Sequence, residues 1–254
     1  MPEAPGNPNR YYVMMGWKDV PHLTPEMCAK MVASIKPYLR KARMEGLPSM
    51  GSGLIFPILE ADITIRDFPI PDYYARCFGM DTGWNWTAGV WLALNRDTGV
   101  NYLYDVYKES QKEPPVHAEG FKSRGAWIPG AGDCADINRM DGQQFLKIYL
   151  GLGLNVELPD KRSKEANIQA VFLLLCTGKL KIFASCVKWF EEFRLYRRDE
   201  NQKVVKENDH LMDATQYGVK SGLPRAITAP IAVLDTAYAL GRHAYPVDHP
   251  FGRN

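Results

Sequence analysis

The sequence predicts an α/β fold in which helices flank the faces of a mixed β-sheet. Three apolar runs, at residues 75–81, 88–94 and 100–107, follow one another with short turns between them, which is typical of strands joined by hairpins. From residue 142 onward, helical and strand patterns alternate, which favours helices packed on a sheet. The 254 residues are 46% hydrophobic and 24% charged, a balance that allows a sizeable core.

The N-terminal part of the chain carries one strong helix signal. Residues 11–17 (YYVMMGW) have strand composition. A helix is predicted over residues 25–43, with Thr24 as its N-cap, a proline at its first position and apolar residues at helical spacing. Glycines at positions 46, 51 and 53 then predict a linker, and short strands separated by prolines are expected in residues 54–71.

The regular core is expected to begin near residue 73. A hairpin turn, Asp97-Thr98-Gly99, joins the second and third strands. The later elements are, in order, a helix at 116–122, a strand at 125–130, a helix at 142–151, a strand at 154–158, a helix at 163–176, a strand at 180–184, a helix at 187–196, a β-hairpin at 197–207 and a last helix at 208–217. The aromatic residues expected in the core are Trp189, Phe190 and Phe193.

Composition argues against several classes of protein. The longest uninterrupted apolar stretch, residues 170–176, is far short of the roughly 20 residues that span a bilayer, and the first ten residues lack the apolar segment of a signal peptide. Five cysteines without a C-x-x-C pair argue against a disulfide scaffold or a structural zinc site. Residues 161–206 hold eleven Lys and Arg against five Asp and Glu, a pattern that fits phosphate contacts and a solvated helical face equally well.

Four aspartates stand at the ends of predicted elements. Asp81 ends the first strand of the core, and Asp133 follows the strand expected at 125–130. Asp209 and Asp213 lie four residues apart at the start of the last helix, so both project from one face. Carboxylates gathered from separate elements repel one another and raise each other's pKa values. A divalent cation removes that penalty, and a set of hard oxygen ligands suits Mg²⁺ or Mn²⁺.

Each of these acids also has an interpretation that is only structural. Asp before Thr-Gly is a frequent turn former, which would account for Asp81. Asp209 fits a helix N-cap, and Asp213 fits a first-turn acid that complements the helix dipole. Their order along the chain favours chemistry: an acid after the first strand, antiparallel hairpins, an acid after the fourth strand, and paired acids that open a late helix. An RNase H-like nuclease needs this order.

Three further residues near the aspartates are weaker candidates. His210, beside Asp209, is predicted to be an exposed helix residue, with a role beside the metal as the alternative. Trp84 and Trp86, in the turn after Asp81, are predicted to pack in the core, with a place along a DNA groove as the alternative.

Around these residues the sequence resembles the large terminase subunits of tailed bacteriophages, in their C-terminal nuclease domain. Four stretches carry the resemblance: KARMEGLPSMGSGLIFPI (41–58), FGMDTGWN (78–85), WIPGAGDCADINRMDG (127–142) and WFEEFRLYRRDENQKVVKENDHLMDATQYG (189–218). The last stretch is long and specific, because an aromatic-acidic helix, a charged hairpin and the pattern N-D-x-x-x-D-A-x-x-Y occur in register. The resemblance covers residues 11–220.

The resemblance implies an RNase H-like, integrase-like mixed sheet flanked by helices, with a β-hairpin before the last core helix. It implies an endonuclease that cuts concatemeric double-stranded phage DNA during genome packaging, by hydrolysis with two Mg²⁺ or Mn²⁺ ions. By position in the motifs, Asp81 is the first metal-bridging acid and Asp133 the second, and the third is Asp209 or Asp213. The implied partners are double-stranded DNA, the portal protein and the small terminase subunit, in the host cytoplasm and away from any membrane.

The chain departs from the family in one respect. A terminase ATPase needs a P-loop of the form G-x-x-x-x-G-K-[ST], whereas the only Gly-Lys of this sequence, at 178–179, is followed by Leu180. The family match therefore implies three parts: residues 1–53 as a linker segment left from the connection to the ATPase, 54–222 as the nuclease domain and 223–254 as a tail. Two rivals stay open, another RNase H-like nuclease of the resolvase or transposase type and a catalytically silent module that docks on the portal.

Overall fold

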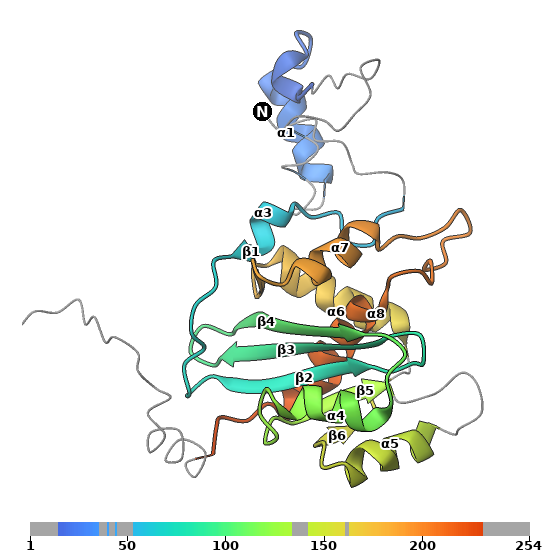
Figure 1. Ribbon diagram of the computed structural model, residues 1–254. Helices are drawn as coiled ribbons and strands as arrows, with labels where there is room; N and C mark the ends of the chain where they lie inside the picture. The colour runs from blue at the N-terminus through green and yellow to red at the C-terminus, as the bar shows by residue number, and fades with distance from the viewer. Residues whose placement is uncertain are drawn as a thin grey trace, which may run out of the picture.

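The computed structural model describes residues 15–35, 40, 44, 53–133, 142–160 and 163–230, and within them a mixed sheet carries helices on both faces (Figure 1). The seven strands of this sheet are β1 Thr64–Ile65, β2 Ala75–Asp81, β3 Thr87–Asn95, β4 Val100–Glu109, β5 Gly130–Asp133, β6 Val156–Glu157 and β7 Leu180–Phe183. None of the helices in this part of the chain is long and apolar enough to cross a membrane.

The sheet combines an antiparallel centre with parallel edges. Its strands lie in the order β1-β7-β4-β3-β2-β5-β6. β2, β3 and β4 pair antiparallel, whereas β1, β7, β5 and β6 run parallel to their neighbours. At the turn between β3 and β4, Gly99 has a φ of +67° and the Asn95 side chain accepts the N–H of Asp97 at 3.0 Å. The predicted mixed sheet and its central hairpins are therefore confirmed.

The helices form two layers, one on each face of the sheet (Figure 1). α6 (Lys164–Cys176), α7 (Val187–Leu195) and α8 (His210–Tyr217) cover one face, and α4 (Pro114–Lys122) and α5 (Gly142–Gly151) cover the other. The remaining elements are η1 Trp17–Asp19, α1 Pro25–Ser34, α3 Glu60–Ile63, η2 Gly218–Gly222 and η3 Leu223–Arg225. Each layer has its own apolar cluster, with Trp189 at the centre of the first and Trp91 in the second.

A close backbone contact seats α8 on β2. A Cβ atom placed on Gly79 would lie 1.9 Å from the carbonyl oxygen of Ala214 and 2.5 Å from the amide nitrogen of Gly218. Both obstacles are backbone atoms, so only a residue without a side chain fits between the strand and the helix. Gly79 precedes Asp81 by two residues and shares its face of the strand. The contact therefore sets how near α8 comes to the end of β2.

Most predicted elements are confirmed within a residue or two at each end. α5 spans the predicted residues 142–151, and the Thr24 hydroxyl accepts the N–H of Met27 at 3.3 Å as the predicted N-cap. The hairpin expected at 197–207 is closed by pairing of Arg198 with Val204. The three aromatic residues predicted in the core are all buried: Trp189, Phe190 and Phe193.

Two predicted elements near the N-terminus are wrong in their extent. Of the strand expected at 11–17, residues 11–14 lie outside the described residues, and Trp17 begins η1. The helix expected to reach residue 43 ends at Ser34, and Ile35 is extended. A proline follows at position 37, and proline cannot continue a helix because it lacks an N–H and its ring meets the carbonyl four residues earlier. Residues 36–39 and 41–43 lie outside the described residues.

Two further elements differ in type or position. The region expected as short strands at 54–71 contains the helix α3 and the two-residue strand β1. The strand expected at 125–130 starts only at Gly130, because Gly125 has a φ of +131° and Pro129 has no N–H for a strand ladder.

The segment expected as a tail begins with residues that contact the sheet. Ala226 is buried, and Ile227 pairs with Arg76 of β2. Residues 231–254 of that segment, and 1–14 of the expected linker, lie outside the described residues. The division into parts 1–53, 54–222 and 223–254 stays a proposal, and these contacts favour a second boundary after residue 227.

Candidate metal centre

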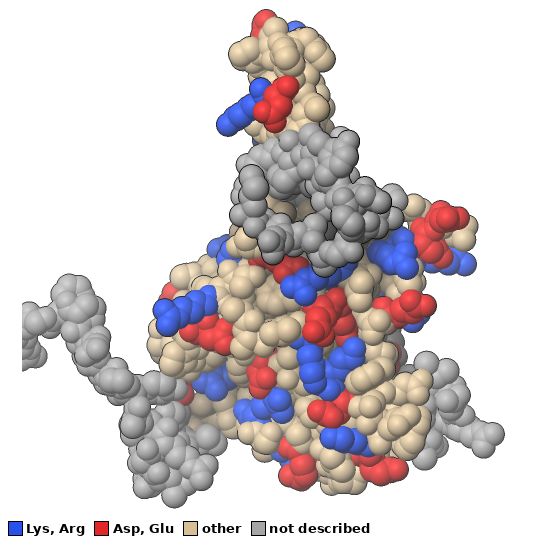
Figure 2. All heavy atoms as spheres, turned by 45° about the horizontal axis from the view of Figure 1, so that its top comes forward, with Lys and Arg blue, Asp and Glu red and all other residues tan. Residues whose placement is uncertain are grey.

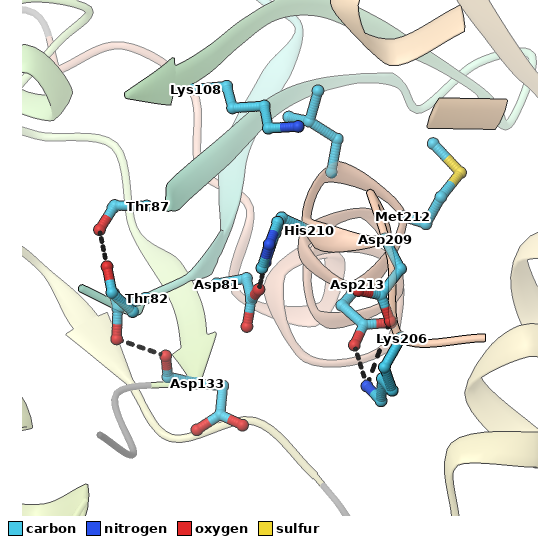
Figure 3. Close-up of polar contacts among 12 residues, drawn as sticks. Asp81, Thr82, Thr87, Lys108, Asp133, Lys206, Asp209, His210, Met212 and Asp213 are labelled. Carbon is cyan, nitrogen blue, oxygen red and sulfur yellow. Dashed lines mark hydrogen bonds and ion pairs between the residues drawn. The ribbon is translucent and has the colours of Figure 1, made fainter. Parts of the chain in front are cut away.

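Two of the predicted aspartates stand side by side on neighbouring strands. Asp81 and Asp133 are Cα partners across the parallel pair of β2 and β5. Neighbouring strands lie about 4.8 Å apart, and side chains at partner positions point to the same face. Thr82 locks the two strand ends together, since its N–H and its hydroxyl both donate to the carbonyl oxygen of Asp133, at 3.0 and 2.8 Å. The register therefore places both carboxylates at one end of the sheet (Figure 3).

The other two aspartates stand at the start of α8. Asp209 and Asp213 are 5% and 6% exposed, so both are removed from water in a way that is rare for an acid without a partner. The N–H of Asp213 donates to the carbonyl oxygen of Asp209 at 2.8 Å, which is the first helical hydrogen bond. The two carboxylates lie on the same face of the helix because they are four residues apart.

Residues at the two ends of α8 contact the two strand acids. His210 Nδ1 lies 3.0 Å from Asp81 Oδ2, and the Tyr217 hydroxyl donates to Asp133 Oδ2 at 3.4 Å. Figure 3 shows Asp81 between Asp133 and the α8 acids. His210, predicted to be an exposed helix residue, instead contacts the first candidate acid. A sequence pattern cannot detect this contact, because the two residues are 129 positions apart.

The electrostatics of this place disfavour an isolated negative charge. Burial raises the pKa of Asp81 from 3.8 to about 6; the hydrogen bond from His210 lowers it, and the charges of Asp213 and Asp133 raise it. The hydrogen bond to Asp81 raises the pKa of His210 in turn. Burial and then the charges of Asp213 and Asp133 raise the pKa of the Tyr217 hydroxyl, so it stays protonated and can donate. The site is therefore short of positive charge around Asp81.

The α8 acids are paired with two lysines. Lys164 Nζ lies 2.9 Å from Asp213 Oδ2, and Lys206 Nζ lies 3.2 Å from both Asp213 Oδ2 and Asp209 Oδ2. Lys164 is the first residue of α6, and Lys206 belongs to the segment that connects the hairpin to α8. Figure 3 shows the Asp209 and Asp213 carboxylates directed toward Lys206.

The chemical type of the candidate ligands suits a divalent cation. All four candidate ligands are carboxylates, the ligands that Mg²⁺ and Mn²⁺ prefer. Asp209 Oδ2 is buried, accepts no hydrogen bond among the described residues and is compensated only by the nearby ammonium groups of Lys206 and Lys164, so it has capacity for a further ligand. Nowhere in the described ranges do three such side chains already stand in the arrangement of a bound ion, since the α8 carboxylates face the lysines.

A residue that sequence reasoning missed caps α8. Asp209 occupies the N-cap position but makes no capping hydrogen bond with its side chain. Instead Glu192 Oε2, from α7, accepts the N–H of Leu211 at 2.7 Å. Glu192 Oε1 pairs with Lys108 Nζ at 2.6 Å, and that ammonium lies 4.7 Å from the centre of the Trp86 ring. Because Glu192 supplies the cap, the carboxylate of Asp209 is not used for capping and contacts Lys206 instead.

Removing Glu192 is expected to destabilise the protein by roughly 2–3 kcal/mol, because Glu192→Ala removes the carboxylate partner of a mostly covered ammonium and leaves a helix N–H without its acceptor. The free energy of unfolding in urea measures the effect. Glu191→Ala is the matched control: the neighbouring residue is exposed, and a change within about 0.5 kcal/mol is expected there. Equal losses in the two variants would contradict the capping role.

The two tryptophans after Asp81 are not core residues, which corrects the expectation from sequence. Trp84 is 55% exposed and Trp86 is 38% exposed. The core positions are filled from the strand and helix interiors by Trp91 and Trp189. Trp84 and Trp86 lie in the loop between β2 and β3, and the Lys108 ammonium lies over the Trp86 ring.

Comparisons with known proteins match the chain to terminases. The family model described as the terminase RNase H-like domain matches residues 78–221. The large terminase subunit of Enterobacteria phage LP7 is 37% identical over 210 residues, which are 79% of this chain and 44% of that protein. The chain therefore spans less than half the length of this curated relative.

Solved structures give the same result. The P22 large terminase nuclease domain is 34% identical with a TM-score of 0.64, and the match covers 70% of this chain and 96% of that one. The large terminase nuclease of thermophilic phage G20c, crystallised with bound magnesium, shares the fold with a TM-score of 0.50 at 17% identity, over 67% of this chain and 98% of that one.

Proposed function

This chain belongs to the terminase RNase H-like domain family, and we propose that it is a metal-dependent endonuclease that cuts concatemeric double-stranded DNA during phage genome packaging. One observation carries the proposal. Asp81 and Asp133 stand in register at adjacent strand ends, and α8, whose start carries Asp209 and Asp213, contacts both of them through His210 and Tyr217. Bound magnesium in the nuclease of phage G20c supports divalent metal as the cofactor.

We propose that Asp81, Asp133 and the α8 pair Asp209 and Asp213 would together hold the Mg²⁺ or Mn²⁺ ions, two being the number expected. When bound, such ions supply Lewis acidity at the attacking water and at the departing 3′ oxygen. His210 orients the carboxylate of Asp81, and Tyr217 orients that of Asp133. Asp213 is proposed as the leading α8 ligand, because the pKa of Asp81 responds to its charge.

Double-stranded DNA is the proposed substrate, held through its phosphates rather than its bases. On the face that Figure 2 shows, Lys and Arg alternate with Asp and Glu. Several basic residues of the 161–206 region are already paired with acids, such as Arg198 with Glu165 and Arg194 with Glu60. Contact with DNA is therefore proposed for cations beside the acid site rather than for one broad basic surface.

The wider setting follows from the family. We propose that the portal protein and the small terminase subunit are partners, and that packaging takes place in the host cytoplasm. Since these 254 residues contain no P-loop, we propose that ATP hydrolysis comes from another segment or chain.

Supercoiled plasmid is expected to be nicked and linearised with millimolar Mn²⁺ and to stay intact in EDTA, because the carboxylates alone cannot activate water. Mn²⁺ is also expected to raise the melting temperature, since a ligand that binds only the folded state stabilises it. Neither a shift nor cleavage would point to a silent docking module. Faster cutting of a four-way junction than of linear duplex would favour a resolvase-type enzyme instead.

A further inference from the structure

Two lysines from separate elements share the acids of α8. Lys164 Nζ and Lys206 Nζ both contact Asp213 Oδ2, at 2.9 and 3.2 Å, and both also contact Asp209 Oδ2, at 3.8 and 3.2 Å. Both carboxylate side chains are almost fully buried, at 7% and 8% exposed, whereas the Lys206 side chain is 65% exposed. Buried carboxylates need compensating charge, and these two ammonium groups supply two positive charges to two negative ones.

One divalent cation carries the same charge as the two lysines together. A cation bound by Asp209 and Asp213 would therefore satisfy the acids without them. It would also repel ammonium groups held within a few ångströms, and such repulsion is strong near a buried site. The lysines and the cation thus compete for the same carboxylate oxygens, and binding of one displaces the other.

The displaced ammonium groups cannot travel far. Lys164 lies in the first turn of α6, where the Ser163 side chain accepts the N–H of Ala166 and fixes the helix start. Lys206 follows the hairpin, which the ion pair of Arg198 with Glu165 fastens to the same helix. Released from the acids, both cations stay at the edge of the site, where a DNA phosphate would approach the carboxylates.

We propose that Lys164 and Lys206 exchange partners: they are the counter-ions of Asp209 and Asp213 before a divalent cation binds, and they contact backbone phosphates of DNA afterwards. The inference rests on the proposed role of these aspartates as metal ligands. On this proposal the two lysines lower the affinity for the divalent cation and raise the affinity for DNA.

The first test measures the affinity for Mn²⁺ in the absence of DNA, with electron paramagnetic resonance as the readout. Lys164→Met with Lys206→Met is expected to tighten Mn²⁺ binding roughly tenfold, because two competing positive charges are gone. Lys206→Met alone keeps Lys164 on Asp213 and is expected to shift affinity in the same direction by a smaller factor, which keeps the test decisive should the double variant fold poorly. Lys203→Met is the control, since Lys203 is an exposed lysine of the same hairpin and no change is expected.

The second test is the affinity for duplex DNA as a function of salt, with Ca²⁺ in place of Mn²⁺ to slow cleavage. Each lost phosphate contact lowers the salt slope by roughly 0.9, so the double variant is expected to bind DNA more weakly and with a slope smaller by about 2. Weaker or unchanged Mn²⁺ binding in both lysine variants, while the wild type binds Mn²⁺, would overturn the exchange and leave the nuclease proposal standing. A wild type that binds no Mn²⁺ and does not cut DNA would overturn both.

Discussion

Replacing Asp81 with asparagine is expected to lower the rate of duplex cleavage at least about a thousand-fold while the protein still folds. In the proposed site Asp81 lies between Asp133 and the α8 acids (Figure 3), so its carboxylate would contribute to holding both ions. A bound metal ion contributes several kcal/mol of charge stabilisation in the transition state, and each 1.36 kcal/mol is about tenfold in rate, so loss of a metal ligand costs several powers of ten. Initial rates of plasmid nicking in Mn²⁺, with circular dichroism as the check on folding, measure the effect.

In the absence of metal, Asp81→Asn is expected to raise the stability of the folded protein, although it lowers the rate of cleavage. The pKa of Asp81 in the folded protein is raised to about 6 from 3.8, so the folded state binds the proton more tightly than the unfolded chain does. The protonated carboxyl of Asp81 contributes up to about 3 kcal/mol to the free energy of unfolding. This contribution is complete below pH 4 and is lost as the pH rises through 6. The raised pKa of His210 acts in the same direction, since its contribution is also lost as the pH rises.

Asp81→Asn removes this loss, because asparagine carries no charge at any pH. The variant is therefore expected to be more stable than the wild type at pH 7 in EDTA, and Mn²⁺ is expected to stabilise only the wild type. Glu200→Gln makes the same chemical change at the exposed hairpin tip and is expected to change neither cleavage nor stability. Cutting by Asp81→Asn at the rate of the wild type in Mn²⁺ would remove Asp81 from the mechanism.

Gly79→Ala is expected to destabilise the protein by at least about 3 kcal/mol and to weaken Mn²⁺ binding. The new methyl group would meet the backbone of Ala214 and Gly218, which cannot move aside as a flexible side chain does. The helix that carries Asp209 and Asp213 must then shift away from β2. Urea denaturation measures the loss, and the rise in melting temperature with Mn²⁺ reports on the separated acids.

Gly151→Ala provides the matched control for that experiment. Gly151 ends α5 on the opposite face of the sheet, and a Cβ there would meet nothing within 4 Å. Alanine is the better helix former, so stability is expected to stay the same or to rise by up to about 1 kcal/mol. If Gly79→Ala proved as stable as Gly151→Ala, the close packing of α8 on β2 would not be the feature that assembles the site.

Much of the fold could be predicted because it depends on neighbours within a few residues. The runs that become β2, β3 and β4 carry their apolar periodicity and their turns in the local sequence. The same holds for α5, α6 and the hairpin before α8, whose bounds agree closely with the pattern. Errors occurred where a proline or glycine decided the boundary, as at Pro129 and Gly125, because a single backbone property there outweighs composition.

The four aspartates were identifiable from sequence for a related reason. Each stands at the end of an element, and element ends follow from local patterns. That these ends meet required the order of the strands, which the resemblance to terminases supplied. The register of Asp81 with Asp133 then follows from the pairing of β2 with β5.

Only the tertiary structure decided how the acids are compensated. The contact of His210 with Asp81, the cap from Glu192 and the pairing of Lys164 with Asp213 join residues 129, 19 and 49 positions apart. No sequence periodicity links such residues, because the distance between them depends on how the helices pack on the sheet. Gly79 determines how closely α8 packs on β2, through a backbone contact. The exposure of Trp84 and Trp86 was likewise decided by the tertiary structure, because an aromatic residue in a loop is buried only if another element covers it.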